Sequence, residues 1–345
     1  MRRTNLIAPL VACGIVLASV GPALLTACSG EDTSGEQSQA QAPTGNGHVD
    51  ATSAAGAVTG ATPSSTPTVT PSPTPAPTPS PTPAPAPARS IFADQLVVAY
   101  YGNPYSPIMG ILGEYDTAEI IRRLRTQAAR YQALVPDKKV TPALHLVYAV
   151  AQANPGDDGS YLYHMPDELV EEFIEVTRRE GMLFIIDLQM GRADPVAEVE
   201  RVRHWLRNEH VHLAIDPEFT MPPGERPGVE LGSMDATTIN AIQDVLQATA
   251  LEAGTANKLL IVHQFQADMI TNKGAIGTDR DRVDVVIDLD GWGPPWSKQE
   301  KYLALGTNEP VEFTGFKLFY RWDEPMLTEE QVIGLVPRPS IIVYQ

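Results

Sequence analysis

The sequence predicts an α/β fold, a (β/α)8 TIM-type barrel, over the region 91–345. Eight short apolar runs, each typical of a strand covered on both faces, alternate with seven helix signals there. No glycine-rich phosphate turn follows the first run, which continues as Tyr100-Tyr-Gly-Asn-Pro-Tyr105, so a doubly wound open sheet ranks second. The sequence stops on the eighth run, and we therefore expect the final helix of the barrel to be absent.

The eight predicted strands share short length and enrichment in Val, Ile, Leu and aromatic residues. They are Leu96–Tyr101, Ala143–Tyr148, Leu183–Leu188, His212–Asp216, Leu259–Gln264, Val283–Leu289, Gly315–Phe319 and Ser340–Tyr344.

Helix-start signals lie between these strands. Thr117 opens a helix over Ala118–Leu134, Pro166 begins the second, and Asp194 and Asp235 precede the third and fourth as N-caps. The segments Ser297–Glu300 and Thr328–Gln331 both fit the capping box. The helix expected in Gln266–Asp281 is the weakest, because that segment is short and contains two glycines.

The residues before the barrel predict export and a membrane anchor. Arg2 and Arg3 precede the apolar run Leu6–Leu25, and small residues follow, as in a secretory signal peptide over 1–27. The order Leu25-Thr-Ala-Cys28 resembles the lipobox of bacterial lipoproteins. This resemblance implies that Cys28 carries a lipid and that the protein sits on the extracytoplasmic face of the cell membrane.

Residues 28–90 are predicted to be a disordered linker, because their Ser, Thr, Gly, Ala and Pro cannot bury a core. Its Thr-Pro-Ser-Pro-Thr-Pro-Ala-Pro repeat favours an extended polyproline spacer. The whole chain has 42 acidic and 25 basic residues, and the region 91–345 keeps most of this excess. That balance argues against nucleic acid and anionic lipid as partners of the domain.

Two carboxylates one residue apart end the fourth predicted strand. Asp216 and Glu218 are separated by Pro217, which cannot donate to a sheet ladder, so the strand is expected to end there. Residues i and i+2 of a strand share a face, and a barrel holds its chemistry at the carboxyl ends of its strands. The pair is therefore either a catalytic acid pair or an acid-rich turn bonded to nearby backbone.

Other polar and aromatic residues fall at the ends of neighbouring strands. We expect Asp187 to be catalytic with the acid pair, and eight further residues to contact a substrate. These eight are Tyr101, Asn103, Gln189, His263, Asp288, Asp290, Trp292 and Trp322. For Asp288 and Asp290 the alternative is that they only cap the loop through Gly291, and Trp322 could equally be packing under a loop.

Clustered carboxylates beside aromatic rings suit glycan hydrolysis. Cleavage of a glycosidic bond needs one carboxylic acid to protonate the leaving oxygen and a second group at the oxocarbenium-like centre. We expect Glu218 to be the acid, because it lies farther out at the barrel mouth, with Asp216 and Asp187 raising its pKa or orienting it. Aromatic faces would support sugar rings, and a polysaccharide or peptidoglycan-type glycan is the expected partner.

The pair also resembles the strand-four motif of chitinase-like glycosidases, Asp-x-x-Asp-x-Asp-x-Glu, and more loosely that of barrel-type lysozymes. Its last two acids fall on Asp216 and Glu218, whereas Val211 and Ala214 occupy the places of the first two. The resemblance implies a glycoside hydrolase with its acid at Glu218.

Two alternatives to a glycosidase remain. A non-catalytic carbohydrate- or wall-binding lipoprotein on a degenerate barrel fits the incomplete motif. A metal-dependent hydrolase would fit if His145, His263, Asp187 and Asp216 converged. It ranks lower because no closely spaced histidine pair is present, and we expect neither a metal nor a cofactor.

Overall fold

The computed structural model describes residues 88–309 and 311–345. Eight parallel strands form a closed ring. Strand β1 pairs with both β2 and β11, and the remaining strands connect β11 to β2 in the order β10, β9, β7, β5 and β4. The barrel strands are β1 (Gln95–Gly102), β2 (Lys139–Ala151), β4 (Leu183–Gly191), β5 (Val211–Thr220), β7 (Lys258–Gln264), β9 (Val283–Leu289), β10 (Phe313–Leu318) and β11 (Ile341–Tyr344). The predicted barrel is confirmed.

The strand β5 continues past its expected end at Pro217. Gln189 of β4 pairs with Asp216, and Gly191 pairs with Thr220, so three residues of β5 oppose one residue of β4. This bulge accommodates the proline, which has no N–H for the ladder. The regular alternation of side chains is interrupted at this point, and this interruption determines where Glu218 lies.

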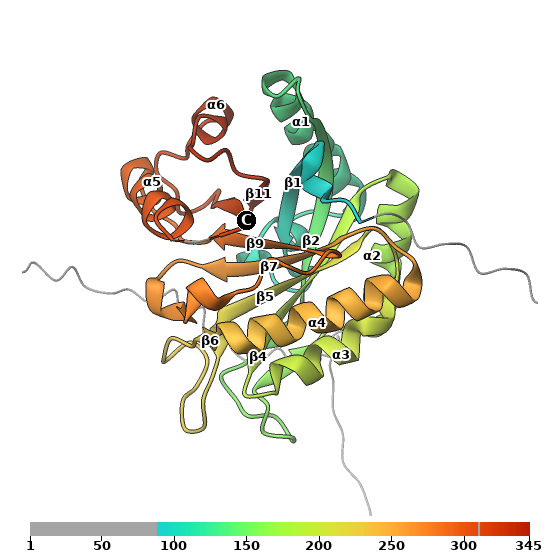
Figure 1. Cartoon of the computed structure of the whole chain (residues 1–345), viewed down its shortest axis with the longest axis vertical. Coiled ribbons are helices and arrows are strands. Elements are labelled where there is room, and N and C mark those ends of the chain that lie inside the picture. Colours follow the sequence, from blue (N-terminus) through green and yellow to red (C-terminus); the bar gives the residue numbers. More distant parts are fainter. Residues whose placement is uncertain (1–87, 310) are drawn as a thin grey trace, which may run out of the picture. The chain divides into compact units, whose positions relative to one another are not determined.

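Six α-helices occur in the described residues. They are α1 (Thr117–Leu134), α2 (Asp167–Glu180), α3 (Pro195–Leu206), α4 (Ala236–Ala253), α5 (Pro295–Tyr302) and α6 (Glu329–Ile333). Figure 1 shows α3 and α4 side by side, where Arg203 donates to Thr249 at 3.1 Å and pairs with Glu252 at 2.6 Å.

Most of the expected helix caps are confirmed. Asp194 and Asp235 cap α3 and α4, and the capping box at Thr328 is formed. Thr117 was expected to open α1, but the cap is Asp116, whose side chain accepts from Glu119 N. The capping box expected at Ser297 is wrong, because α5 already begins at Pro295, ahead of that serine.

Two parts of the barrel wall differ from a regular repeat. After β7 the weak helix is replaced by short 3₁₀ turns at Ala267–Met269 and Lys273–Ala275, between which β8 (Ile270–Thr271) pairs with β6 (Met234–Asp235). A short antiparallel strand, β3 (Leu162–His164), extends the sheet beside β2.

Helix α1 covers the outside of the last strand. Its Gln127 donates to Glu329 of α6 at 2.8 Å and to the Tyr344 hydroxyl of β11 at 3.0 Å. The hydroxyls of Tyr131 and Tyr344 lie 2.7 Å apart. Contacts from α1 and α6 therefore cover this part of the barrel, where the final helix was expected to be absent.

The barrel interior is apolar toward the amino ends of the strands. Phe92 and Phe313 close that end, with ring centroids 4.8 Å apart. The side chains above them are small or branched: Val97, Ala99, Ala143, Ile185, Ala214, Ile261, Val286, Ile341 and Val343. Such a filled layer makes the barrel a packed core and leaves its carboxyl end for chemistry.

A buried lysine anchors the amino end of β7. Lys258 is fully buried, and its Nζ donates to the carbonyl oxygens of Asn208, Glu209 and Val211 at 2.6, 3.2 and 3.2 Å. Burial lowers the pKa of this ammonium group to about 7. The three carbonyl groups satisfy the donors that burial would otherwise leave unpaired.

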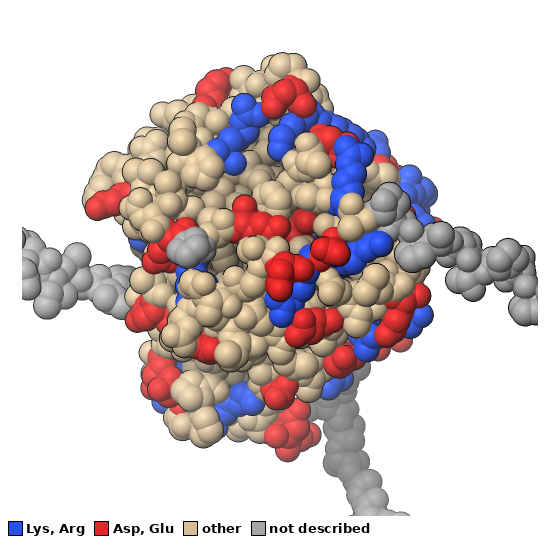
Figure 2. Space-filling model, in the orientation of Figure 1, with Lys and Arg blue, Asp and Glu red and all other residues tan. Residues whose placement is uncertain are grey.

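The predicted signal peptide (1–27), the predicted lipidation site Cys28 and the predicted linker up to residue 87 lie outside the described residues. In the described part, no helix is long and apolar enough to cross a membrane. Figure 2 shows Asp and Glu side chains spread over this face of the domain, with Lys and Arg among them.

Candidate active site at the carboxyl ends of the barrel strands

A layer of buried polar side chains lies above the apolar layer. Its members come from six strands and are Tyr101, His145, Asp187, His263, Asp288 and Lys317, none of them more than 4% exposed. Burying polar and charged groups is unfavourable unless they are paired. A layer of this kind is therefore typical of a functional site and atypical of a structural core.

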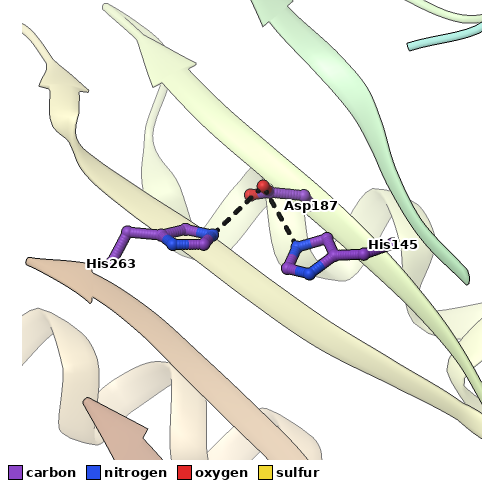
Figure 3. Close-up of side chains that lie close together, drawn as sticks. All are labelled: His145, Asp187 and His263. Atoms are coloured by element: carbon purple, nitrogen blue, oxygen red, sulfur yellow. Dashed lines mark ion pairs between the residues drawn. The ribbon is translucent and has the colours of Figure 1, made fainter. Parts of the chain in front are cut away.

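Two histidines and one aspartate converge at the centre of this layer (Figure 3). The Nε2 atoms of His145 and His263 lie 3.2 and 3.3 Å from the same Asp187 oxygen, Oδ2. Burial would raise the pKa of Asp187, but His263 and His145 hold it well below its usual range. Burial lowers the pKa of His145, whereas the charge of Asp187 overcomes burial and raises the pKa of His263.

The other side of His263 faces two more carboxylates. Its Nδ1 lies 3.1 Å from Asp288 Oδ2 and 3.4 Å from Asp290 Oδ2. Asp290 is only partly buried and pairs with Lys317 Nζ at 2.9 Å. Both oxygens of Asp288 lack a hydrogen-bond partner in the described structure, so the alternative interpretation of Asp288 as a loop cap is wrong.

Glu218 lies in the bulge of β5, and Asp216 is the last paired residue before it. Asp216 is 4% exposed and accepts the Glu218 N–H at 3.1 Å, whereas Glu218 is partly exposed at the mouth. Burial, assisted by the charge of Asp187, raises the pKa of Asp216 to about 7. Burial and the charges of Asp216 and Asp290 raise the pKa of Glu218 to about 9. Glu218 therefore keeps a proton near neutral pH.

Asp187 affects the acid pair electrostatically, through the pKa of Asp216. It is fully buried, and its charge raises the pKa of Asp216, whereas the main charges acting on Glu218 are those of Asp216 and Asp290. The expected influence of Asp187 on the acid pair thus reaches Asp216 directly.

Two of the expected substrate contacts also have partners within the protein. Asn103 Nδ2 donates to the carbonyl oxygen of Val147 at 3.1 Å, and its Oδ1 accepts from Tyr105 N at 2.9 Å. Gln189 Oε1 accepts from Ala151 N at 2.9 Å. Both side chains fix the backbone at the strand ends.

The expected aromatic contacts differ in exposure. Trp292 is 41% exposed, while Trp322 is half-buried with its ring 5.9 Å from that of Phe319. Tyr101 is buried beneath Lys317, whose Nζ lies 3.7 Å from the ring centroid. Among these three, Trp292 offers the most accessible ring at the mouth.

Lys317 was not predicted as a site residue, although a lysine inside the apolar run Gly315–Phe319 is a recognisable signal. A buried ion pair that holds the mouth loops was not predicted either. Lys298 Nζ lies 2.7 Å from Asp323 Oδ2, and Asp323 also accepts from Gly293 N at 3.0 Å and Phe319 N at 2.9 Å. This pair fixes the loops that carry Trp292 and Trp322.

No protein-family model matches the chain, and no curated protein sequence matches it. Among solved structures, the chain is similar to a xyloglucan-specific endo-β-1,4-glucanase of family GH5 from a metagenomic library, with 13% identity, a TM-score of 0.34 and coverage of 63% of this chain and 77% of that one. It is also similar to a Bacillus subtilis mannanase, with 12% identity, a TM-score of 0.37 and coverage of 74% and 80%. It is also similar to an N-acetylneuraminate lyase from Aliivibrio salmonicida, with 11% identity, a TM-score of 0.34 and coverage of 72% of this chain and 68% of that one. At these values the reaction has to be argued from the site itself.

Proposed function

We propose that the barrel mouth is a glycoside-hydrolase-type active site and that the protein is a surface lipoprotein acting on an extracytoplasmic glycan. The observation that carries the proposal is the placement of Glu218. This carboxyl group is partly exposed, lies in a bulge at the end of β5, and experiences the charges of Asp216 and the ion-paired Asp290. Bulges beside active sites commonly redirect a reactive side chain.

Glu218 serves as the general acid. Because burial and neighbouring charge raise its pKa to about 9, it is protonated at neutral pH and can donate to a leaving glycosidic oxygen. Asp216 holds the backbone N–H of Glu218 and supplies part of that charge. In the buried layer, the charge of Asp187 adds to the effect of burial in raising the pKa of Asp216.

Asp290 is the second carboxylate that the reaction needs. Its side chain is 14% exposed, and its Oδ2 lies 2.9 Å from Lys317 Nζ, which fixes the direction of the carboxylate. In this position it stabilises the oxocarbenium-like centre or activates a water molecule. The exposed ring of Trp292 forms an apolar platform for a sugar ring.

The membrane anchor forms part of the same proposal. The lipobox at Cys28 and the Pro-rich linker support a domain held away from the membrane toward a wall or capsular glycan. Labelling cells with a radioactive fatty acid tests this part. The wild type should incorporate label and Cys28→Ser should not, and equal labelling of the two would refute the anchor.

A binding module is the second candidate function. Trp292, which follows β9, and Trp296, in the first turn of α5, are 41% and 68% exposed, and exposed rings of this kind can bind a sugar without cleaving it. The same glycans distinguish the two candidates, since a binding module retains them without releasing new reducing ends.

The decisive experiment measures reducing-end release from a panel of wall and capsular glycans by the full-length protein. Glu218→Gln should lower the rate by about 10²- to 10⁴-fold, the usual contribution of a general acid. The matched control is Glu172→Gln on the exposed face of α2, which should retain full activity. Equal hydrolysis by Glu218→Gln and the wild type would remove Glu218 from the mechanism. Retention of glycan without hydrolysis would favour the binding module.

A further inference from the structure

We propose that His145, Asp187 and His263 bind one divalent transition-metal ion, with Zn²⁺ as the preferred ion. The three side chains come from β2, β4 and β7 and point toward one another, with both imidazoles facing Asp187 (Figure 3). One atom from each, an imidazole nitrogen or a carboxylate oxygen, lies within 4.8 Å of the others. The site goes beyond the proposed glycoside hydrolysis, which needs no metal ion.

The spacing of the ligand atoms fits a metal ion. Zn²⁺ binds nitrogen and oxygen at about 2.0–2.1 Å, so two ligands of a tetrahedral ion lie about 3.3–3.4 Å apart. The Nε2 atoms of His145 and His263 lie 3.2 and 3.3 Å from Asp187 Oδ2. Two imidazoles that approach one carboxylate oxygen at these distances leave a shared position for an ion that contacts all three.

The same atoms lack hydrogen bonds, although the side chains are buried. Neither ring nitrogen of His145 or His263 and neither oxygen of Asp187 forms a hydrogen bond within the described structure, despite the short distances between them. All three residues are fully buried. Buried polar atoms are satisfied in the great majority of folded proteins, so six unsatisfied atoms in one cluster indicate a missing partner. A metal ion supplies that partner for the inward-facing atoms.

Asp288 is not one of the proposed ligands, but it lies beside His263 and can fix the orientation of that ring. A metal-binding histidine typically donates its second ring N–H to a carboxylate, which fixes the tautomer and the ring orientation. His263 presents Nε2 to Asp187 and places Nδ1 3.1 Å from Asp288 Oδ2. Asp288 is itself fully buried and has no hydrogen bond, so the proposed ion also accounts for this carboxylate.

The local charge is compatible with a cation. Besides the imidazoles themselves, the positive group beside the cluster in the described residues is Lys317, and its Nζ pairs with Asp290 Oδ2 at 2.9 Å. Asp187 and Asp288 remain as fully buried carboxylates without a lysine or arginine partner in the described residues. Two imidazoles and one carboxylate supply nitrogen and oxygen ligands. This ligand set suits Zn²⁺ and neighbouring first-row transition-metal ions better than Mg²⁺ or Ca²⁺.

The test is Zn²⁺ binding by the full-length protein after treatment with a chelator, measured by competition with a chromophoric chelator. We expect one ion per chain and, with Co²⁺ in place of Zn²⁺, a visible absorption band that reports a low-symmetry site. His145→Gln and Asp187→Asn should lower the Zn²⁺ affinity at least about 100-fold, and Asp288→Asn about 10- to 100-fold. The matched control is His212→Gln, which changes a buried histidine of β5 that contacts Leu259 N and should leave the affinity unchanged.

Two further measurements keep the proposal falsifiable. Zn²⁺ should raise the melting temperature of the wild type and raise it less in Asp288→Asn. This comparison still tests Zn²⁺ binding if the variants of the three ligand residues fail to fold. Glu218→Gln should bind Zn²⁺ as the wild type does, so loss of glycan hydrolysis and loss of the ion are separate results. Folded wild type that binds no stoichiometric Zn²⁺, or equal affinities in His145→Gln and His212→Gln, would overturn the proposal.

Discussion

Replacing Glu218 by glutamine should change how the stability of the protein depends on pH. The pKa of Glu218 is raised from the usual 4.5 to about 9, mainly by burial. Between these values the folded state keeps a proton that the unfolded state releases, so the free energy of unfolding falls as pH rises. Each pKa unit corresponds to about 1.4 kcal/mol, which gives an upper bound of about 4 kcal/mol between pH 5 and pH 8.

Water at the partly exposed mouth reduces this amount, and we expect a difference of at least about 1 kcal/mol. Urea denaturation of the wild type, Glu218→Gln and the surface control Glu172→Gln at pH 5 and pH 8 measures it. The wild type and the control should lose more stability over this interval than Glu218→Gln. Identical losses in all three proteins would show that Glu218 has an ordinary pKa, and the assignment of a neutral-pH proton donor would fail with it.

Three substitutions test the elements that support the site. Lys258→Met leaves three carbonyl groups at the amino end of β7 without their donor and should lower the free energy of unfolding by about 2–5 kcal/mol in urea denaturation. Asp323→Asn breaks the buried pair with Lys298, so we expect a loss of about 3–5 kcal/mol and faster proteolysis of the mouth loops. In Gly315→Ala the added Cβ would lie 2.5 Å from Asp288 Oδ1, which should cost about 1–3 kcal/mol and weaken Zn²⁺ binding. No change in stability for any of these variants would contradict the packing described.

The barrel was predictable because its signals are local. Each buried strand is a short apolar run, and several helices begin at an aspartate or threonine that caps them. The bulge at Pro217 was not predictable, since the proline indicates only that the ladder is interrupted. Whether the chain ends the strand or inserts extra residues depends on its pairing with β4, which is a tertiary contact.

The site was predictable as a set of residues and not as a geometry. Most of the polar side chains of the site could be identified because they lie at the carboxyl ends of predicted strands, and all barrel strands run in the same direction. The convergence of His145, Asp187 and His263 depends on the stagger between β2, β4 and β7, which no local pattern encodes. In the sequence His145 and His263 lie in separate apolar runs, and the structure places both rings around one carboxylate oxygen of Asp187.

Glu218 in the bulge of β5 and Asp187 of β4 are carboxylates in two different environments. Asp187 is enclosed between imidazoles, and its pKa is held low. In the bulge, burial together with the charges of Asp216 and Asp290 raises the pKa of Glu218. Groups of one chemical type whose pKa values are moved in opposite directions can act as proton donor and fixed charge within one site. Straightening β5 by deleting Pro217 and Phe219, which leaves Glu218 alone opposite Met190, should therefore abolish the elevated pKa of Glu218 while the His145–Asp187–His263 cluster continues to bind Zn²⁺. A parallel loss of both would show that the two layers are a single unit.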